Sequence, residues 1–357
     1  MALKRKVSSK FSTSERAAKT VRTAPCSRES SASPVPASSK ELSSSFSPEF
    51  HDSQQEEVIA RYQNIAQQSV DWFVDNCLAK VDDERVSIVF GALKNLDNDG
   101  LTEDGRVQAF STRSPSQMRV TKKEVQKTFS QFIQNILDND PEKVEICNFL
   151  TFKHSIGEGT STDADGVSTA RAFGYGHLGA VEDWADVFLA EEFKLKSASP
   201  DVNQNRQNIM WSGTRMLLND GRREFAFGLT VEDTQAQLWR FSRSGIIVSE
   251  PFQWIENPMP LIRLVLSLSY YPKNEQDHDS ARRKMGLDTT LSPVLDADRS
   301  VARDEYGYPQ YRFRVKSIDN EKEYEYETIK VLSNLKAKDF LSRSTRVWLV
   351  RRIDRPK

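Results

Sequence analysis

A glutamate and a lysine two residues apart, Glu192 and Lys194, are the residues of this chain whose types and spacing point to chemistry. On a β-strand, residues i and i+2 project from the same face, so both side chains would meet one ligand. A carboxylate binds hard cations such as Mg²⁺, and a lysine ammonium can hold an attacking water in place. The spacing therefore predicts a small metal-dependent site on one strand face.

Such a site needs a second carboxylate and gains from a polar side chain on the following helix. Asp163, Asp165 and Asp186 precede the strand, and Asp165 and Glu192 are the candidate metal ligands. Gln207, early in the next predicted helix, is the candidate helix-borne residue. This order resembles PD-(D/E)xK nucleases, in which an E-x-K pair and a neighbouring aspartate hold Mg²⁺. The alternative is a Glu–Lys pair on a solvated strand face, which would contribute little.

Two other segments resemble ligand loops. The run Gly174–Val181 fits the Gly-rich loop pattern of protein kinases, with Lys194 and Lys196 behind it. The sequence has no His-Arg-Asp catalytic loop and no Asp-Phe-Gly motif, so we interpret this run as a flexible loop. The run Asn95–Gly100 is spaced like the start of a calcium-binding loop, but Arg106 stands where a bidentate carboxylate is required. A surface turn explains it.

Four arginines, Arg222, Arg223, Arg240 and Arg243, fall at strand ends and turns of one predicted meander. Their planar guanidinium groups could bind phosphate or carboxylate groups in a fork geometry. The alternative is a set of surface arginines, one or two of which pack their stems against Trp239.

The sequence predicts that a β-sheet and one long helix position these residues. The predicted order is a strand over 184–196, a helix over 203–219 and strands over 224–231, 236–241 and 245–249. Phe225, Phe227 and Leu229 alternate with smaller or polar residues, so one face of that strand must be covered. A helix is predicted from Pro258, and the charged segment Gln276 to Arg283 predicts a loop.

Helical patterns precede this segment and a β-hairpin follows it. Thr121 and Glu124 form a capping box ahead of an apolar stripe that ends at Ile136. A further helix is predicted from Ser53, with Ile65 and Phe73 in its stripe. Near the C-terminus, strands over 311–318 and 323–332 flank a turn, and a third strand is predicted over 345–353.

Composition limits the classes of function. Of the 357 residues, 38% are apolar, and residues 1–52 are rich in Ser, Pro, Lys and Arg, which predicts a disordered tail. With 50 Lys and Arg against 51 Asp and Glu, net charge does not support nucleic-acid binding. Cys26, Cys77 and Cys147 form no disulfide framework, and the most apolar stretch, 260–271, is too short to span a membrane. We expect an intracellular protein of the cytoplasm or nucleus, without membrane association.

The order of several motifs carries a resemblance. The motifs occur in a fixed order along the chain. They are Trp184, Glu192-Phe193-Lys194, Gln207, Arg222-Arg223-Glu224-Phe225-Ala226-Phe227-Gly228, Leu238-Trp239-Arg240-Phe241-Ser242-Arg243-Ser244-Gly245, Ser249-Glu250-Pro251-Phe252, Met285-Gly286-Leu287-Asp288-Thr289-Thr290 and Arg343-Ser344-Thr345-Arg346-Val347-Trp348. Over residues 150–357 this resembles the fungal-type protein kinases of mushroom-forming fungi, with their motifs E-x-K, Q, R-R-x-F-x-x-G, R-x-x-D-R-x-G, S-x-P-F, L-G-x-D-P-T and G-R-(G/A)-T-x-V-W.

Departures from the family pattern matter as much as the matches. Ser242 stands where the family has an aspartate, and Ser342 stands where it has a glycine. The resemblance implies ATP and Mg²⁺ only for a C-terminal catalytic part, which these residues do not include. No cofactor is expected for the chain alone, which we interpret as a truncated kinase-like chain or pseudoenzyme.

Together these patterns predict an α+β chain in four parts. They are a disordered tail (1–52), a mainly helical segment (53–150), a nuclease-like α/β accessory domain (151–295) and the first β-strands of a truncated kinase-like N-lobe (296–357). The predicted function is the non-catalytic accessory or recognition portion of a fungal-type protein kinase. Its expected partners are other proteins or a kinase C-lobe. The alternative is a metal-dependent nuclease-like domain that uses Glu192 and Lys194.

Overall fold

The computed structural model describes part of the chain. The described residues are 65–142, 148–150, 166–169, 187–269, 275–297, 301–305, 307–318, 321–333 and 346–353. The expectations for the tail, the helix start at Ser53, the run Gly174–Val181 and the aspartates 163, 165 and 186 lie outside these residues. Within them the chain is a mixed α/β protein with two sheets.

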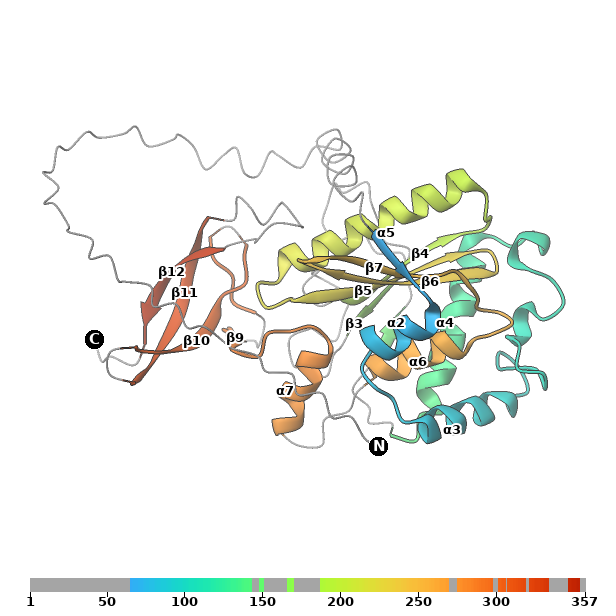
Figure 1. Cartoon of the computed structure of the whole chain (residues 1–357), viewed down its shortest axis with the longest axis horizontal. Coiled ribbons are helices and arrows are strands. Elements are labelled where there is room, and N and C mark those ends of the chain that lie inside the picture. Colours follow the sequence, from blue (N-terminus) through green and yellow to red (C-terminus); the bar gives the residue numbers. More distant parts are fainter. Residues whose placement is uncertain are drawn as a thin grey trace, which may run out of the picture. The chain divides into compact units, whose positions relative to one another are not determined.

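An eight-stranded mixed sheet is the larger of the two (Figure 1). Its strands are β1 (Ile65–Gln68), β2 (Asn148–Leu150), β3 (Gly166–Thr169), β4 (Val187–Lys194), β5 (Phe225–Glu232), β6 (Gln235–Ser242), β7 (Gly245–Ser249) and β8 (Phe252–Gln253). The strand order is β1-β7-β6-β5-β4-β3-β2, and β8 pairs with β6. The β4–β5 and β1–β7 pairs are parallel and the others antiparallel, so the predicted meander β5–β6–β7 is confirmed.

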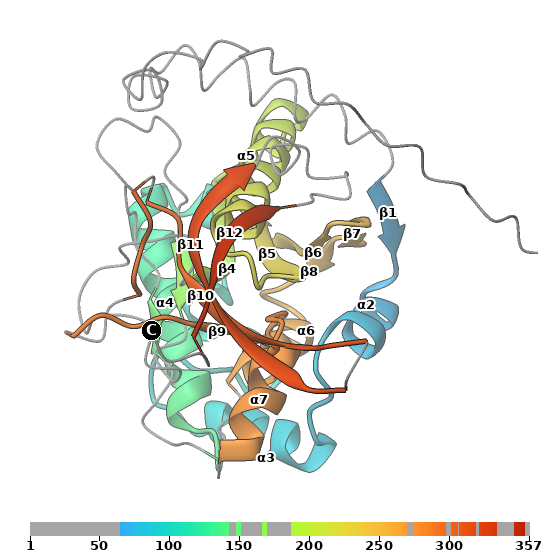
Figure 2. The same ribbon diagram turned by 90° about the vertical axis from the view of Figure 1, so that its left-hand side faces the viewer.

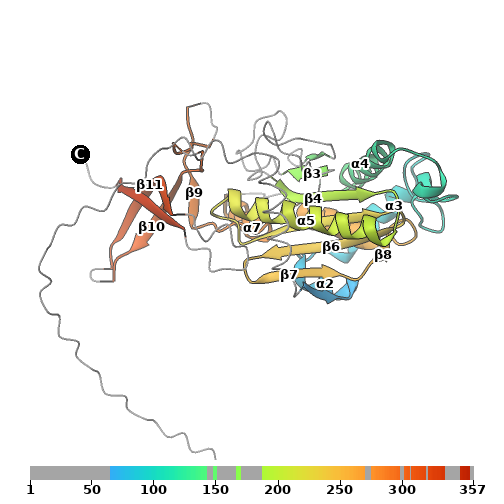
Figure 3. The ribbon, with the colours of Figure 1, turned by 90° about the horizontal axis from the view of Figure 1, so that it is seen from above.

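One face of this sheet is covered by a single long helix, α5 (Ser199–Asn219), which runs along the strands in Figure 3. Two glycines allow the close approach. A Cβ on Gly213 would lie 2.5 Å from the ring of Phe241, and one on Gly228 would lie 2.8 Å from Ile209. Ile209, Met216 and Trp239 are buried between helix and sheet. The helix starts four residues before the predicted one and ends where predicted.

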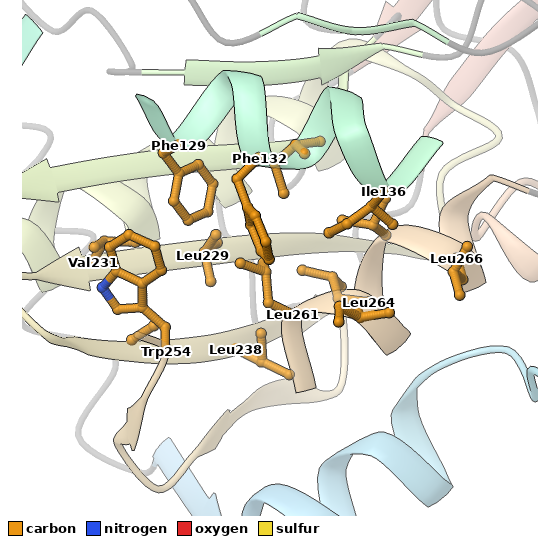
Figure 4. Close-up of a cluster of buried hydrophobic side chains, with 14 of the residues drawn as sticks. Phe129, Phe132, Ile136, Leu229, Val231, Leu238, Trp254, Leu261, Leu264 and Leu266 are labelled. Carbon is orange, nitrogen blue, oxygen red and sulfur yellow. The ribbon is translucent and has the colours of Figure 1, made fainter. Parts of the chain in front are cut away.

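The opposite face carries the main apolar core (Figure 4). Helices α2 (Val70–Cys77), α4 (Lys122–Asp138) and α6 (Met259–Leu268) pack there, and α3 (Asp83–Lys94) adds buried apolar side chains to the same core. Phe129 of α4 packs edge-on against Phe193 and Trp254, with ring centroids 5.1 and 5.3 Å apart. Phe227 is 2% exposed on this face, as the alternation along its strand predicts. The capping box of Thr121 and Glu124 at the start of α4 is also confirmed.

A buried ion pair between Arg85 and Asp140 connects the helices around this core. Arg85 lies on α3 (Asp83–Lys94), and its Nε donates to Asp140 Oδ1 at 2.8 Å. Arg85 Nη2 also donates to the carbonyl of Ser269, just after α6, at 3.2 Å. Two short 3-10 helices, η1 (Gln108–Phe110) and η2 (Pro115–Gln117), link α3 to α4. The pair therefore holds the ends of α4 and α6 against α3.

The smaller sheet has the order β12-β11-β10-β9 (Figure 2). Its strands are β9 (Leu291–Pro293), β10 (Tyr311–Lys316), β11 (Glu323–Ser333) and β12 (Val347–Arg352). β10 and β11 pair antiparallel from Lys316 opposite Glu323, so the predicted hairpin and third strand are confirmed. Glu327 of β11 receives hydrogen bonds from Arg312 and Arg351 on the neighbouring strands at 2.9 and 2.6 Å.

Two local predictions are wrong. Ile65, expected in a helical stripe, lies in β1 opposite Ile246, because pairing with a strand far along the chain outweighs the local pattern. The segment expected as a charged loop forms α7 (Glu275–Lys284). Its last turn carries Arg282, Arg283 and Lys284, which favour the negative end of a helix. In the described ranges no helix has the length and apolar character needed to cross a bilayer.

Candidate functional site

The predicted pair Glu192 and Lys194 lies on the face of β4 that α5 covers. Glu192 is 1% exposed and opposite Thr230 in the parallel register, and Lys194 is opposite Glu232. Lys194 Nζ donates to Gln204 Oε1, in the first turns of α5, at 2.8 Å. Because Glu192 is buried, the alternative of a solvated Glu–Lys pair does not describe this carboxylate.

A carboxylate that sequence reasoning missed, Glu232, lies beside this pair. It is 4% exposed at the end of β5, on the same sheet face as Glu192 and Thr230. Asn205 Nδ2 donates both to Glu232 Oε1 at 2.5 Å and to the Glu192 carbonyl at 3.0 Å. Burial raises the pKa of Glu232 to about 7, although hydrogen bonds with Asn205 and Thr230 act in the opposite direction. Glu232 therefore titrates near neutral pH.

The helix-borne residue differs from the expected one. Gln207 is exposed on the outer side of α5. The neighbouring Asn208 instead donates its Nδ2 to Glu192 Oε2, at 3.4 Å, and Asn205 is fully buried. A single residue step turns a helical side chain by about 100°, so adjacent positions face different surroundings. Gln207 and Asn208 therefore face different surroundings, and of the two it is Asn208 that contacts Glu192.

This acidic cluster (Glu192, Glu232, Lys194, Asn205 and Asn208) brings two carboxylates and two amides together beneath α5. Two buried carboxylates either share a proton or gain from a cation between them. Among the residues that the structure describes, no group of three or more His, Cys, Asp or Glu side chains is placed to hold a metal ion. The candidate ligand Asp165 lies outside those residues, so a third ligand has to come from elsewhere in the chain or from solvent.

The four predicted arginines meet in one open pocket of about 450 Å³ at the other end of α5. The lining residues are Gly221, Arg222, Arg223, Glu224, Phe225, Arg240, Ser242, Arg243, Ser244 and Asp288. They come from the loop after α5, the start of β5, the end of β6 with its turn, and the segment after α7. Three of the segments that carry the family resemblance thus converge on this pocket.

Each arginine is held by packing or by hydrogen bonds. Arg222 forms a two-pronged pair with Asp220, with Nη2 to Oδ2 at 2.6 Å. The Arg223 guanidinium lies 4.5 Å from the ring centre of Phe188, and that of Arg240 lies 4.3 Å from the ring centre of Phe225. Arg243 Nη2 donates to the carbonyl of Leu217, in the last turn of α5, at 3.0 Å. The arginine that lies over Trp239 is Arg206.

A backbone pairing fixes one wall of this arginine pocket. Glu224 N donates to Gly286 O at 2.8 Å, and Asp288 N donates to Arg222 O at 2.7 Å. Gly286 has a φ of 82°, and a Cβ there would lie 2.4 Å from the carbonyl oxygen of Phe225. Glycine is therefore required at this position, for both conformation and space.

A junction beside the pocket joins the two sheets. Tyr311 of β10 donates its hydroxyl to Asp220 Oδ1 at 3.0 Å and accepts from Gly221 N at 2.9 Å. Arg346, just before β12, donates to the carbonyls of Leu217 and Leu218 at the end of α5. Burial would raise the pKa of Asp220, but the charges of Arg222 and Arg223 hold it well below its usual range.

The sequence matches the model of a known protein family. The family described as fungal protein kinase matches residues 175–356, about half of the chain. No curated protein and no solved structure matches the sequence. The acidic cluster, the arginine pocket and the smaller sheet all lie within the matched range.

Proposed function

We propose that this chain, which belongs to the fungal protein kinase family, supplies the accessory and recognition portion of a kinase and does not itself transfer phosphate. The support is chemical. A kinase needs a catalytic aspartate after a His-Arg pair and a metal-binding Asp-Phe-Gly, and the 357 residues contain neither motif. ATP and Mg²⁺, which the family implies, would belong to a catalytic part with those groups.

The junction between the two sheets is the observation that carries this proposal. The last carbonyls of a helix have no partner within the helix, and here Arg243 and Arg346 donate to them. Tyr311 reaches the same helix end and is 2% exposed. The accessory α/β part thereby supports β10–β12, the strands that the resemblance assigns to the start of a kinase lobe.

The smaller sheet also presents apolar surface. Leu332, Val347 and Leu349 are 55%, 45% and 41% exposed on its last two strands. Apolar side chains grouped on one sheet commonly mark a protein contact. This supports a protein partner or a kinase C-lobe as the body that packs against β11 and β12.

Two measurements on the full chain test the accessory role. With labelled ATP, Mg²⁺ and a generic protein substrate, we expect no phosphotransfer above a mock preparation. Phosphotransfer that Lys194→Met or Lys196→Met abolishes would overturn the proposal. In hydrogen exchange, Arg346→Gln should speed exchange of β10–β12 amides and leave those of α4 unchanged. Unchanged exchange throughout would show that the junction does not support the sheet.

A second candidate function is a nuclease-like metal site, and one observation favours it. Glu232 gives Glu192 a buried carboxylate neighbour on the adjacent parallel strand. Glu192 and Glu232 would hold Mg²⁺ or Mn²⁺, and Lys194 would orient a water for attack on a phosphodiester. Asn205 and Asn208 would fix the carboxylates against α5.

A Mn²⁺ titration and a DNA-nicking assay test this candidate. We expect Mn²⁺ binding that Glu192→Gln and Glu232→Gln remove, without cleavage by any variant. Gln207→Ala, at an exposed position of the same helix, is the matched control and should bind Mn²⁺ normally. Cleavage lost in Glu192→Gln would establish an active nuclease. Equal Mn²⁺ binding by all variants, or no Mn²⁺ binding by the unaltered chain, would show that Glu192 and Glu232 do not form a metal site.

A further inference from the structure

The arginine pocket holds more positive charge than its own carboxylates neutralise. Four arginines line it, against the carboxylates of Glu224 and Asp288. Arg222 also has Asp220 as its partner. By contrast, no described carboxylate pairs with Arg240 or Arg243. The guanidinium groups of Arg240 and Arg243 therefore bring positive charge to the pocket that no described carboxylate pairs with, in a chain whose net charge is −1.

Contacts with neighbouring groups hold the guanidinium groups of Arg240 and Arg243 at the pocket. The Arg240 guanidinium lies over Phe225, and its buried Nε has no hydrogen-bond partner among the described residues. Arg243 is anchored to the carbonyl of Leu217, and burial together with repulsion from Arg346 lowers its pKa to about 10. Like charges held close in a partly buried site are stabilised by a bound anion.

The shape and charge of the pocket favour one compact anion over a polyanion. Planar guanidinium groups match the oxygens of a phosphate, and a phosphorylated side chain carries nearly two negative charges at neutral pH. Glu224 is exposed at the rim and, with Asp288, would repel the flanking phosphates of a nucleic-acid strand. Because Arg240 already covers one face of the Phe225 ring, that ring is a poor platform for stacking a base.

We propose that the arginine pocket binds a single phosphate monoester, as carried by a phosphorylated serine or threonine side chain of a partner protein. The site is independent of whether the chain acts as an accessory portion of a kinase. Ser242 and Ser244 add hydroxyl donors at the pocket wall, and their Oγ atoms lie 2.9 Å apart. Ser242 Oγ donates to the carbonyl of Gly245 at 3.0 Å, and a rotation of this hydroxyl would transfer its hydrogen bond to a bound phosphate.

Ser242 is an uncharged residue in the wall of this pocket. An aspartate at that position would place a carboxylate among the four arginines and neutralise part of their charge. The serine leaves the pocket open to an anion from outside. The same position therefore offers the sharpest test, since one substitution changes charge while another of equal size does not.

The experiment is a calorimetric titration of the full chain with N-acetyl phosphoserine amide. We expect binding of one ligand per chain, and none of N-acetyl serine amide. Ser242→Asp should weaken binding about tenfold or more, because its charge lies close to the guanidinium groups. Ser242→Asn, similar in size but uncharged, should stay within about twofold of the unaltered chain. Equal thermal midpoints of the two variants would confirm that both are folded.

Other ligands and variants identify the source of the phosphate. If inorganic phosphate binds as tightly as the capped phosphoserine, the anion site stands and its ligand is free phosphate. Tighter binding of the capped phosphoserine assigns it to a side chain. Arg243→Lys keeps the charge but removes the fork, and should weaken binding several-fold. No binding of either phosphate, or binding that Ser242→Asp leaves unchanged, would overturn the proposal.

Discussion

The two ends of α5 meet opposite chemistry. Its N-terminal half covers the carboxylates of Glu192 and Glu232, and its last turn is held by Arg243 and Arg346. The cations at the last turn are favoured by the negative end of the helix, whereas the carboxylates contact Asn205 and Asn208, beyond the first turn. From Asn205 to Leu217 the helix rises about 18 Å, so the two sites are too far apart to neutralise each other. One element thus positions an acidic cluster and a basic pocket.

The largest effect should come from the apolar core on the sheet face opposite α5. Phe227→Ala deletes a ring that is 2% exposed beneath the sheet, and we expect a loss of about 3–5 kcal/mol in the free energy of unfolding. Urea unfolding followed by circular dichroism measures it. Ile88→Ala, at a position 47% exposed on α3, is the control and should cost well under about 1 kcal/mol. A similarly small cost for Phe227→Ala would place that ring outside the core.

The basic end should be the more sensitive of the two to loss of one charge. Asp220→Asn leaves Arg222 buried without its carboxylate, which we expect to cost about 3 kcal/mol or more at pH 7. The pKa of Asp220 is depressed in the folded chain, so its contribution is present above the ordinary carboxyl pKa and lost as pH falls below it. The difference between Asp220→Asn and the unaltered chain should therefore shrink on acidification. A difference that does not change with pH would contradict this assignment.

The acidic end should respond in the opposite direction. Burial raises the pKa of Glu232 to about 7, so folding favours its protonated form. Its stabilising contribution is complete below the ordinary carboxyl pKa and is lost as pH rises through 7. Glu232→Gln should therefore be about 1–3 kcal/mol more stable than the unaltered chain at pH 8 and about equal to it at pH 4. Unfolding curves at the two pH values measure this. Lower stability of the variant at pH 8 would show an ionised, well-paired Glu232.

The smallest effect should appear at the helix terminus itself. Arg243→Met removes a hydrogen bond to Leu217 O and a cation from the negative end of α5, at an expected cost of about 1 kcal/mol. Arg206→Met is the matched control, because Arg206 is exposed in the N-terminal half of the same helix. It should cost about half as much or less. Equal costs would show that the hydrogen bond from Arg243 to the end of α5 adds no stability.

Local patterns predict most of the elements of this fold. Alternation in β5–β7 and the capping box of α4 are properties of neighbouring residues, so the sequence contains them. The pairing of β1 with β7 is non-local, and no pattern near Ile65 indicates it. The acidic cluster likewise combines a local feature with a non-local one. Glu192 and Lys194 share a face by spacing alone, while Glu232 joins them only through the register of β4 with β5.

The β1–β7 pairing has a consequence for how the chain is made. During synthesis Ile65 emerges long before its partner Ile246, so β1 has no strand to pair with until β7 has been made. Contacts between residues far apart in the chain form slowly, and an open strand edge invites pairing with other molecules. The early product would therefore depend on chaperones or low concentration to avoid aggregation. Moving the β1 segment to follow β7 through a short linker should speed refolding.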